Sequence, residues 1–172
     1  NVVVEAPVKK AELKKEENKH LKLHIAGKGM THHFSGSLPE GVINFGEVES
    51  SKDFISQAGI CIVPIQSGSG LRIKILEAMA SGRAVVSTSV GVQGLELKSG
   101  EHYLVADSPG DFADAIIHLQ NEQTYRRLSI NARDTCLMKY DAVTLGKNLI
   151  SFYEQFLNTF KPNHPLGEKG TH

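Results

Sequence analysis

The sequence predicts an α/β domain with a Rossmann-like, doubly wound parallel sheet and additional helices at its C-terminus. Two observations lead to this fold class. Short segments rich in Val and Ile alternate with segments of helical periodicity from about residue 20 to residue 121. After residue 121 only helical patterns follow. Strands and helices that alternate at this spacing form a parallel sheet with helices on both faces.

The predicted strands are short, β-branched and mostly bounded by Gly, Pro or Ser. They cover residues 21–27, 42–48, 60–65, 84–89 and 102–107. Residues 1–20 are rich in Lys and Glu and contain Pro7, although a doubly wound domain normally opens on a buried strand. We therefore expect the first strand to be degenerate, within the segment VVVEA, or missing.

Capping residues mark two helices between the strands. Ser50 precedes Asp53 by three residues, which is the spacing of a capping box at a helix N-terminus. Ser108 and Asp111 repeat this spacing, and Pro109 stands at the first helical position that proline favours. Both segments are therefore predicted to begin helices that cover the sheet.

The C-terminal part is predicted to be helical and then flexible. Two helical segments follow residue 121, and Asp141 lies at the break between them. The last twelve residues contain two Pro, two Gly and no apolar period. We expect one domain over residues 1–160 and a flexible tail over residues 161–172.

Composition and charge exclude several classes of protein. The 172 residues are 40% hydrophobic and 22% charged with a formal net charge of zero, which is typical of one globular domain and offers no basic face for nucleic acid. No apolar run reaches the roughly 18 residues of a membrane span, and no signal-peptide pattern occurs. Cys61 and Cys136 are expected to be buried and unpaired, which indicates a reducing compartment. We expect a cytoplasmic protein.

The segment SGSGLRIKILEAMASG, residues 67–82, combines a glycine-rich loop with a charged helix. The loop follows the strand 60–65, and ligands of doubly wound sheets bind at the carboxyl ends of strands. The first N–H groups of the helix and its dipole favour a phosphate there. A tight strand-to-helix turn without a ligand is the alternative interpretation.

The charges of this helix favour a nucleotide. Lys74 and Glu77 share one face with Gly70, whereas Arg72 points away from it unless the first turn is unwound. An i,i+3 ion pair on a solvated edge is the alternative. The flanking residues are apolar nearly all round, as in a buried helix with one open stripe. A nucleoside diphosphate would offer its diphosphate to Lys74 and its ribose diol to Glu77.

The longer stretch SGSGLRIKILEAMASGRAVVSTSVGVQGL resembles the donor-binding region of retaining glycosyltransferases of family 4, which have the GT-B fold. The resemblance extends over most of residues 20–140, including LHIAGKG, INFGEVESSKDFISQAGICIVPI and the NAR and Tyr of residues 131–140. It implies that the chain is the C-terminal, nucleotide-sugar-binding half of such an enzyme.

The resemblance also implies roles for individual residues. Glu77 matches the second glutamate of the family's E-x(7)-E motif, which holds the ribose hydroxyls. The first glutamate would fall at Ser69, so this chain has a hydroxyl where the family often has a carboxylate that contacts the sugar. The residues matching the donor diphosphate site are Gly68, Ser69, Gly70, Leu71, Arg72 and Lys74; those matching the nucleobase loop are Gly27, Gly46 and Val48.

The implied function is transfer of a hexose from a nucleoside-diphosphate sugar to a glycan, lipid or small acceptor. The acceptor domain, with part of the catalytic machinery, would lie outside this chain and could bring peripheral membrane association. No cofactor is expected. No metal is expected either, because the chain has no D-x-D motif and the adjacent His32 and His33 are poorly placed to share one ion. The alternatives are a nucleotide-binding regulatory module without turnover and a domain like the sugar-nucleotide epimerases of this fold.

Overall fold

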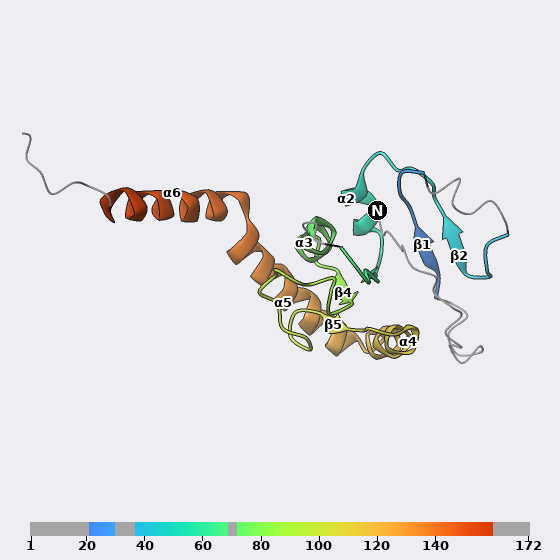
Figure 1. The fold of residues 1–172 in the computed structure, drawn as a ribbon. Coiled ribbons are helices and arrows are strands. Elements are labelled where there is room, and N and C mark those ends of the chain that lie inside the picture. The colour runs from blue at the N-terminus through green and yellow to red at the C-terminus, as the bar shows by residue number, and fades with distance from the viewer. Residues whose placement is uncertain (1–20, 30–36, 69–71, 160–172) are drawn as a thin grey trace, which may run out of the picture.

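The computed structural model describes residues 21–29, 37–68 and 72–159 (Figure 1). Each predicted strand is confirmed by a shorter one within its range: β1 (Leu23–Ile25), β2 (Val42–Asn44), β3 (Ile60–Val63), β4 (Ala84–Ser87) and β5 (Leu104–Val105). The helices are α2 (Ser51–Ser56), α3 (Ile73–Ala80), α4 (Pro109–His118), α5 (Glu122–Tyr140) and α6 (Ala142–Thr159). Asp141 separates the last two helices, as predicted. The predicted tail lies outside the described residues.

All strand pairings are parallel, as the alternating pattern predicts, but the strands form two sheets in the described part of the chain. One sheet has the order β1-β2 and the other β3-β4-β5. In a doubly wound sheet of strand order 3-2-1-4-5-6 the first strand lies between the second and the fourth. If β1 corresponds to the second strand of that order, β3 corresponds to the fourth. The first strand would then be expected between β1 and β3, where the two described sheets are separate.

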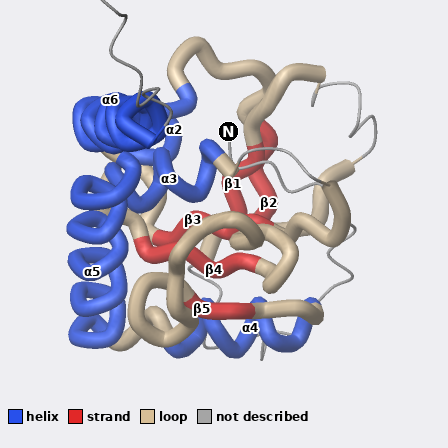
Figure 2. Tube along the Cα trace, turned by 60° about the vertical axis from the view of Figure 1, so that its left-hand side comes forward, coloured by secondary structure: helices blue, strands red, loops and turns tan. Residues whose placement is uncertain are grey.

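Strand β4 lies at the centre of the hydrophobic core, and its four residues are all buried. Val85 points to one side, where it packs with Ile75 and Met79 of α3 and Ala132 of α5. Val86 points to the other side, where Ala115 of α4 and Leu119, the C-cap residue of this helix, cover it. The helices therefore enclose both faces of the larger sheet, and Figure 2 shows α3 and α4 on opposite sides of it. This arrangement is the doubly wound layering predicted from the sequence.

Side-chain caps begin four of the described helices, including α6, where the Asp141 carboxylate accepts from the Val143 and Thr144 amides. The Ser50 side chain accepts from the Asp53 amide at α2, and the Asn121 side chain caps α5 in the same way. At α4 the capping box is complete, because Ser108 and Asp111 bind each other's backbone N–H groups. The hydrogen bonds from Ser108 lower the pKa of the Asp111 carboxyl. Both predicted capping positions are thus confirmed.

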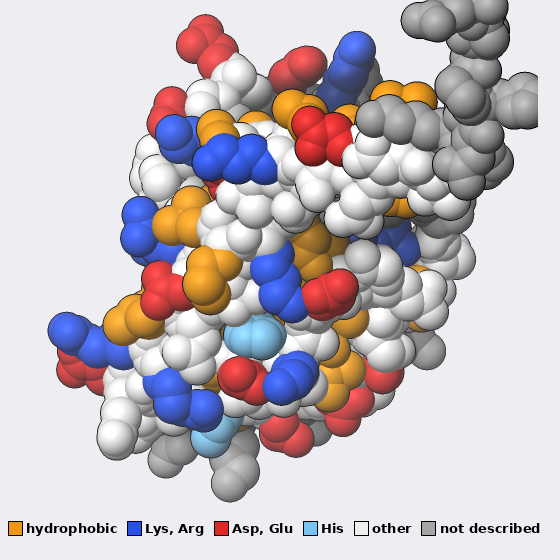
Figure 3. Space-filling view, turned by 90° about the vertical axis from the view of Figure 1, so that its left-hand side faces the viewer, with side chains coloured by type: hydrophobic (Ala, Val, Ile, Leu, Met, Phe, Trp, Pro, Cys, Tyr) orange, Lys and Arg blue, Asp and Glu red, His pale blue; other side chains and the backbone are white. Residues whose placement is uncertain are grey.

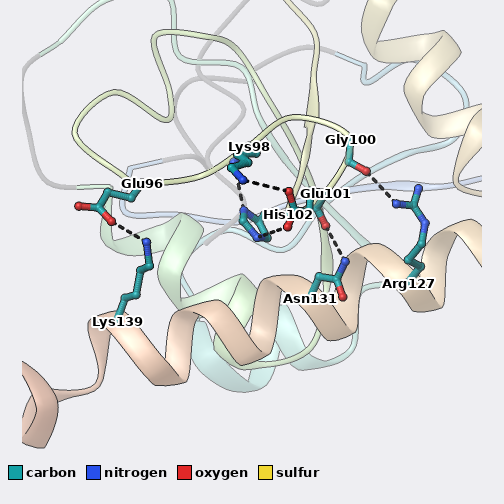
Figure 4. A network of polar contacts seen from close by, with 8 residues as sticks. All are labelled: Glu96, Lys98, Gly100, Glu101, His102, Arg127, Asn131 and Lys139. Atoms are coloured by element: carbon teal, nitrogen blue, oxygen red, sulfur yellow. Dashed lines mark hydrogen bonds and ion pairs between the residues drawn. The ribbon is translucent and has the colours of Figure 1, made fainter.

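The segment between β4 and β5 is fastened to α5 by polar contacts (Figure 4). Lys139 donates to Glu96 over 2.5 Å, and Arg127 donates to the Gly100 carbonyl over 3.0 Å. The hydrogen bond from Lys139 lowers the pKa of the Glu96 carboxyl, while Glu96 raises the pKa of Lys139. The Tyr140 hydroxyl also accepts from the Glu96 amide. These exposed contacts set the position of the segment, although each contributes little to stability.

Helix α6 projects away from the rest of the fold (Figure 1). None of its side chains is buried. One half of its circumference is nevertheless apolar, because residues at spacings of three and four are large and hydrophobic. The exposed apolar residues of α6 are Val143, Leu145, Leu149, Ile150, Phe152, Tyr153, Phe156 and Leu157. Among the described helices, none is both long and apolar enough to cross a bilayer.

The two thiols agree with the expectation from the sequence, and charge of both signs is mixed over one face of the surface. Figure 3 shows basic and acidic side chains mixed over one face, without a patch of single sign. Cys61 and Cys136 are both free and buried. Burial raises the pKa of the Cys61 thiol to about 11, so the native protein keeps this cysteine protonated at neutral pH.

Gly91 in the loop after β4 provides a test of the packing. A Cβ atom at this position would lie 2.2 Å from Ser87 Oγ and 3.3 Å from the Thr88 carbonyl. We predict that Gly91→Ala lowers the free energy of unfolding by about 1–3 kcal/mol, because the buried Ser87 must move. Gly59→Ala is the matched control, since its Cβ would meet nothing within 4 Å. Urea unfolding of both variants measures the difference; equal midpoints would contradict the close packing at Gly91.

Candidate functional site

The loops that follow β1 and β2 meet at two of the predicted nucleobase-loop residues. The Gly27 amide donates to the Gly46 carbonyl over 2.8 Å. Gly46 has a φ of +65°, a conformation that favours glycine. Val48, two residues further on, is half-buried. The structure therefore brings Gly27 and Gly46 together at the carboxyl ends of two adjacent parallel strands, where ligands of this sheet type bind.

The loop between β3 and α3 is held by Arg72. The Arg72 guanidinium donates from Nη2 to the Gly68 carbonyl over 2.7 Å and to the Val90 carbonyl over 3.3 Å. Arg72 Nε is buried and has no hydrogen-bond partner among the described residues. Gly68 has a φ of +131°, which only glycine adopts readily. Arg72 thus joins the loop after β3 to the loop after β4.

Arg72 precedes α3 instead of lying on it, which accounts for its separation from the Lys74 face. The first described helical residue is Ile73, and Arg72 is the N-cap. Ile73 is 53% exposed, so the expectation that apolar residues of this helix are buried nearly all round is wrong at its first turn. The predicted site residues Ser69, Gly70 and Leu71 lie outside the described residues.

Two hydroxyl groups at the end of β4 fix the neighbouring loop. The buried Thr88 hydroxyl donates to the Ile65 carbonyl and accepts from the Gly91 amide. The buried Ser87 hydroxyl lies 3.3 Å from the Val63 carbonyl, to which it donates. Both contacts tie the carboxyl end of β4 to that of β3. The sequence contains these hydroxyls within a predicted strand, but the pattern does not reveal their partners.

Lys74 and Glu77 form the ion pair that their helical spacing allows. Lys74 Nζ lies 2.8 Å from Glu77 Oε2, and about a third of each side chain is exposed, 37% for Lys74 and 32% for Glu77. Lys74 also donates to the Ser51 hydroxyl over 3.0 Å. Sequence reasoning missed Ser51, because its side chain meets α3 only through the packing of α2 on that helix.

The N-terminus of α3 differs from those of the capped helices. Arg72 makes no capping hydrogen bond with its side chain, and the first turn of α3 carries no acidic residue. By contrast, α2, α4 and α5 each have a capping side chain and an acidic residue in the first turn. Within the described residues, no cap or first-turn carboxylate therefore offsets the N–H groups of the first turn of α3 and the positive end of its dipole. Such a terminus suits an anion.

A surface hollow of about 500 Å³ lies elsewhere, between β5 and α4. Its lining includes Asp107, Asp111, Asp114 and His118. Three carboxylates around one hollow disfavour a diphosphate by like-charge repulsion. The hollow is therefore not the site predicted from the sequence.

Comparison with known proteins identifies the family. The family model for "Glycosyl transferases group 1" matches residues 5–122, which is more than half of the chain. A 44.6 kDa protein in the cps region of Klebsiella pneumoniae is 32% identical over 139 residues, covering 74% of this chain and 35% of that protein. The phosphatidyl-myo-inositol mannosyltransferase of Mycobacterium leprae is 25% identical over 124 residues, covering 70% of this chain and 33% of that enzyme. The chain spans about a third of the length of these relatives.

The fold is shared with solved GT-B glycosyltransferases. HepE from Anabaena, in complex with UDP, superposes with a TM-score of 0.69 at 13% identity over 87% of this chain and 46% of that chain. At this identity the likeness concerns the fold, and it confirms the Rossmann-like α/β class. The match of the family model over more than half of the chain shows that this chain belongs to the group 1 glycosyl transferases.

Proposed function

We propose that this chain is the donor-binding domain of a retaining glycosyltransferase, which transfers a hexose from a nucleoside-diphosphate sugar. Family membership supports glycosyl transfer in general. The finer proposal is carried by one observation: the uncapped N-terminus of α3 lies beside Arg72 and one turn from a partly exposed carboxylate, Glu77. A nucleoside diphosphate has an anion for the first feature and a vicinal diol for the second.

The proposed diphosphate site consists of backbone N–H groups and a nearby positive charge. Breaking the glycosidic C–O bond leaves negative charge on the departing diphosphate, and groups already oriented towards that charge stabilise the transition state. The first turn of α3 and the Arg72 guanidinium supply such groups. The sequence has no D-x-D motif to hold a divalent ion on the diphosphate. We therefore propose that the transfer needs no metal.

The nucleobase is proposed to lie against the loops after β1 and β2. Gly27 and Gly46 are joined by a main-chain hydrogen bond and have no side chains, so this part of the site consists of backbone groups. Val48 follows Gly46 by two residues. Because these contacts would come from the main chain, the sequence does not identify which base they bind. HepE, the structural relative, was crystallised with UDP and with UDP-glucose. UDP is accordingly the first diphosphate to test.

The acceptor site is proposed to lie on a second domain of a longer protein. The chain covers 35% and 33% of its two curated relatives, so these proteins contain much more sequence than the donor domain. The apolar half of α6 offers a surface for that domain, because eight large hydrophobic residues are exposed on this helix. Such a surface normally belongs to an interface. Lys147 and Glu154 balance the charge of its polar half, which differs from the cationic face of a membrane-binding helix.

Donor binding gives the first prediction for this function. UDP, GDP and ADP are titrated into the chain by calorimetry, and we expect one of them, with UDP first, to bind. Glu77→Ala should weaken that binding by about 10-fold or more, because a hydrogen bond to a charged group contributes roughly 1.5–3 kcal/mol. Glu101→Ala is the control, since Glu101 is also paired with a lysine at i,i+3 spacing but lies in another segment. If none of the three diphosphates binds, or if Glu77→Ala binds like the parent protein, the assignment is wrong.

The exposed face of α6 gives a second prediction. The double variant Leu149→Lys with Phe156→Lys should lower the fluorescence of a bound hydrophobic dye while changing the free energy of unfolding by no more than about 0.5 kcal/mol, because α6 buries no side chain. Asn148→Lys with Gln155→Lys adds the same charge to the polar half and should leave the dye signal unchanged. A large loss of stability in the first variant would show that α6 packs against the rest of this chain.

A further inference from the structure

The carboxylate of Glu77 is held at one oxygen by groups from two helices. Lys74 Nζ lies 2.8 Å from Glu77 Oε2, within α3. The Ser51 hydroxyl, at the start of α2, lies 3.4 Å from the same oxygen, to which it donates. Lys74 donates to the Ser51 hydroxyl in turn, over 3.0 Å. The three side chains therefore close a small ring of contacts, and Glu77 Oε1 has no partner among the described residues.

This ring determines how Glu77 can meet a ligand. A free glutamate side chain loses rotamer entropy when it is fixed by a ligand. In this chain, Lys74 and Ser51 already restrain the Glu77 side chain at Oε2 in the folded protein. Part of the entropy loss therefore occurs during folding and not when a ligand binds. Oε1 stays available to accept hydrogen bonds, and 32% of the Glu77 side chain is exposed. A carboxylate oriented in advance binds a diol more tightly than a mobile one.

The same contacts limit what Lys74 does. Its ammonium group has three donors, and two of them face Glu77 and Ser51. Its charge is compensated by Glu77, so the pair exerts little net attraction on a distant diphosphate. We propose, on the basis of the function proposed above, that Ser51 and Lys74 are positioning residues for the ribose ligand Glu77. Lys74 then acts through Glu77 instead of binding the diphosphate.

Ser51 also connects two parts of the nucleotide site. It is three residues from Val48 and directly follows Ser50, the residue that caps α2. Its hydroxyl reaches Lys74 and Glu77 across the contact between α2 and α3. The position of the Glu77 carboxylate is thereby linked to the loop proposed to bind the base.

The experiment compares two ligands that differ only in the ribose hydroxyls. Calorimetry measures the binding of UDP, or of the diphosphate that binds best in the panel above, and of its 2′,3′-dideoxy analogue. If Lys74 acts through Glu77, Lys74→Met should weaken binding of the normal diphosphate about 3- to 10-fold and leave binding of the dideoxy analogue unchanged. Ser51→Ala should show the same pattern with a smaller change. The conservative variants Ser51→Thr and Lys74→Arg should keep most of the parent protein's preference for the normal diphosphate over the dideoxy analogue, because each keeps the hydrogen-bond donor.

Other outcomes overturn the proposal. An equal loss for both ligands in Lys74→Met would identify Lys74 as a diphosphate ligand, and no loss for either ligand would remove its role. The controls are Ser56→Ala, whose hydroxyl donates to the Asp53 carbonyl on the same helix, and Lys98→Met, which breaks an i,i+3 pair elsewhere. A parent protein that does not distinguish the two ligands would instead refute the role of Glu77, and with it the proposed function. Thermal unfolding of each variant confirms that it is folded.

Discussion

The pairing of β3 with β4 is the constraint on which the rest of the structure depends. Four consecutive residue pairs join these strands, from Ile60 with Ala84 to Val63 with Ser87. Because the strands are parallel, the loops that follow them leave at the same edge of the sheet. Helix α3 connects the two strands and packs on one face of β4 through Ile75 and Met79. The N-terminus of α3 is therefore fixed near the edge of the sheet from which both loops begin.

Buried polar contacts make this edge more rigid than apolar packing alone would. Ser87 and Thr88 follow one another at the end of β4, and their hydroxyls donate to carbonyls at and beyond the end of β3. Arg72 adds a third connection, between Gly68 and Val90. The Val63 and Val90 carbonyls also accept from the backbone amides of Thr88 and Gln93, so these side-chain contacts add to backbone hydrogen bonds at the same edge. The same contacts that satisfy the backbone thus shape the loops around the proposed diphosphate site.

The parts of the fold that could be predicted from sequence are those decided by local chemistry. Ser50 and Ser108 cap helices through residues three positions away, so their spacing is sufficient evidence. The shared face of Lys74 and Glu77 likewise follows from helix geometry. Ser51 could not be found in this way, because its partners are 23 and 26 residues distant and meet it only when α2 packs on α3. The Val90 carbonyl could not be identified as a partner of Arg72 for the same reason, since Val90 lies 18 residues away.

The electrostatics of the site follow from these unpredicted contacts. Because the charges of Lys74 and Glu77 compensate each other, this ion pair mainly orients the two side chains. Electrostatic attraction for an anion must therefore come from groups whose charge is not compensated. The first turn of α3 is one such group, since its N-cap residue makes no capping hydrogen bond and the turn itself contains no acidic residue. Arg72 is another, because its hydrogen bonds go to the neutral carbonyls of Gly68 and Val90 and leave its charge intact. Both are held by the β3 and β4 loops before any ligand arrives, so a bound anion requires little reorganisation of the protein.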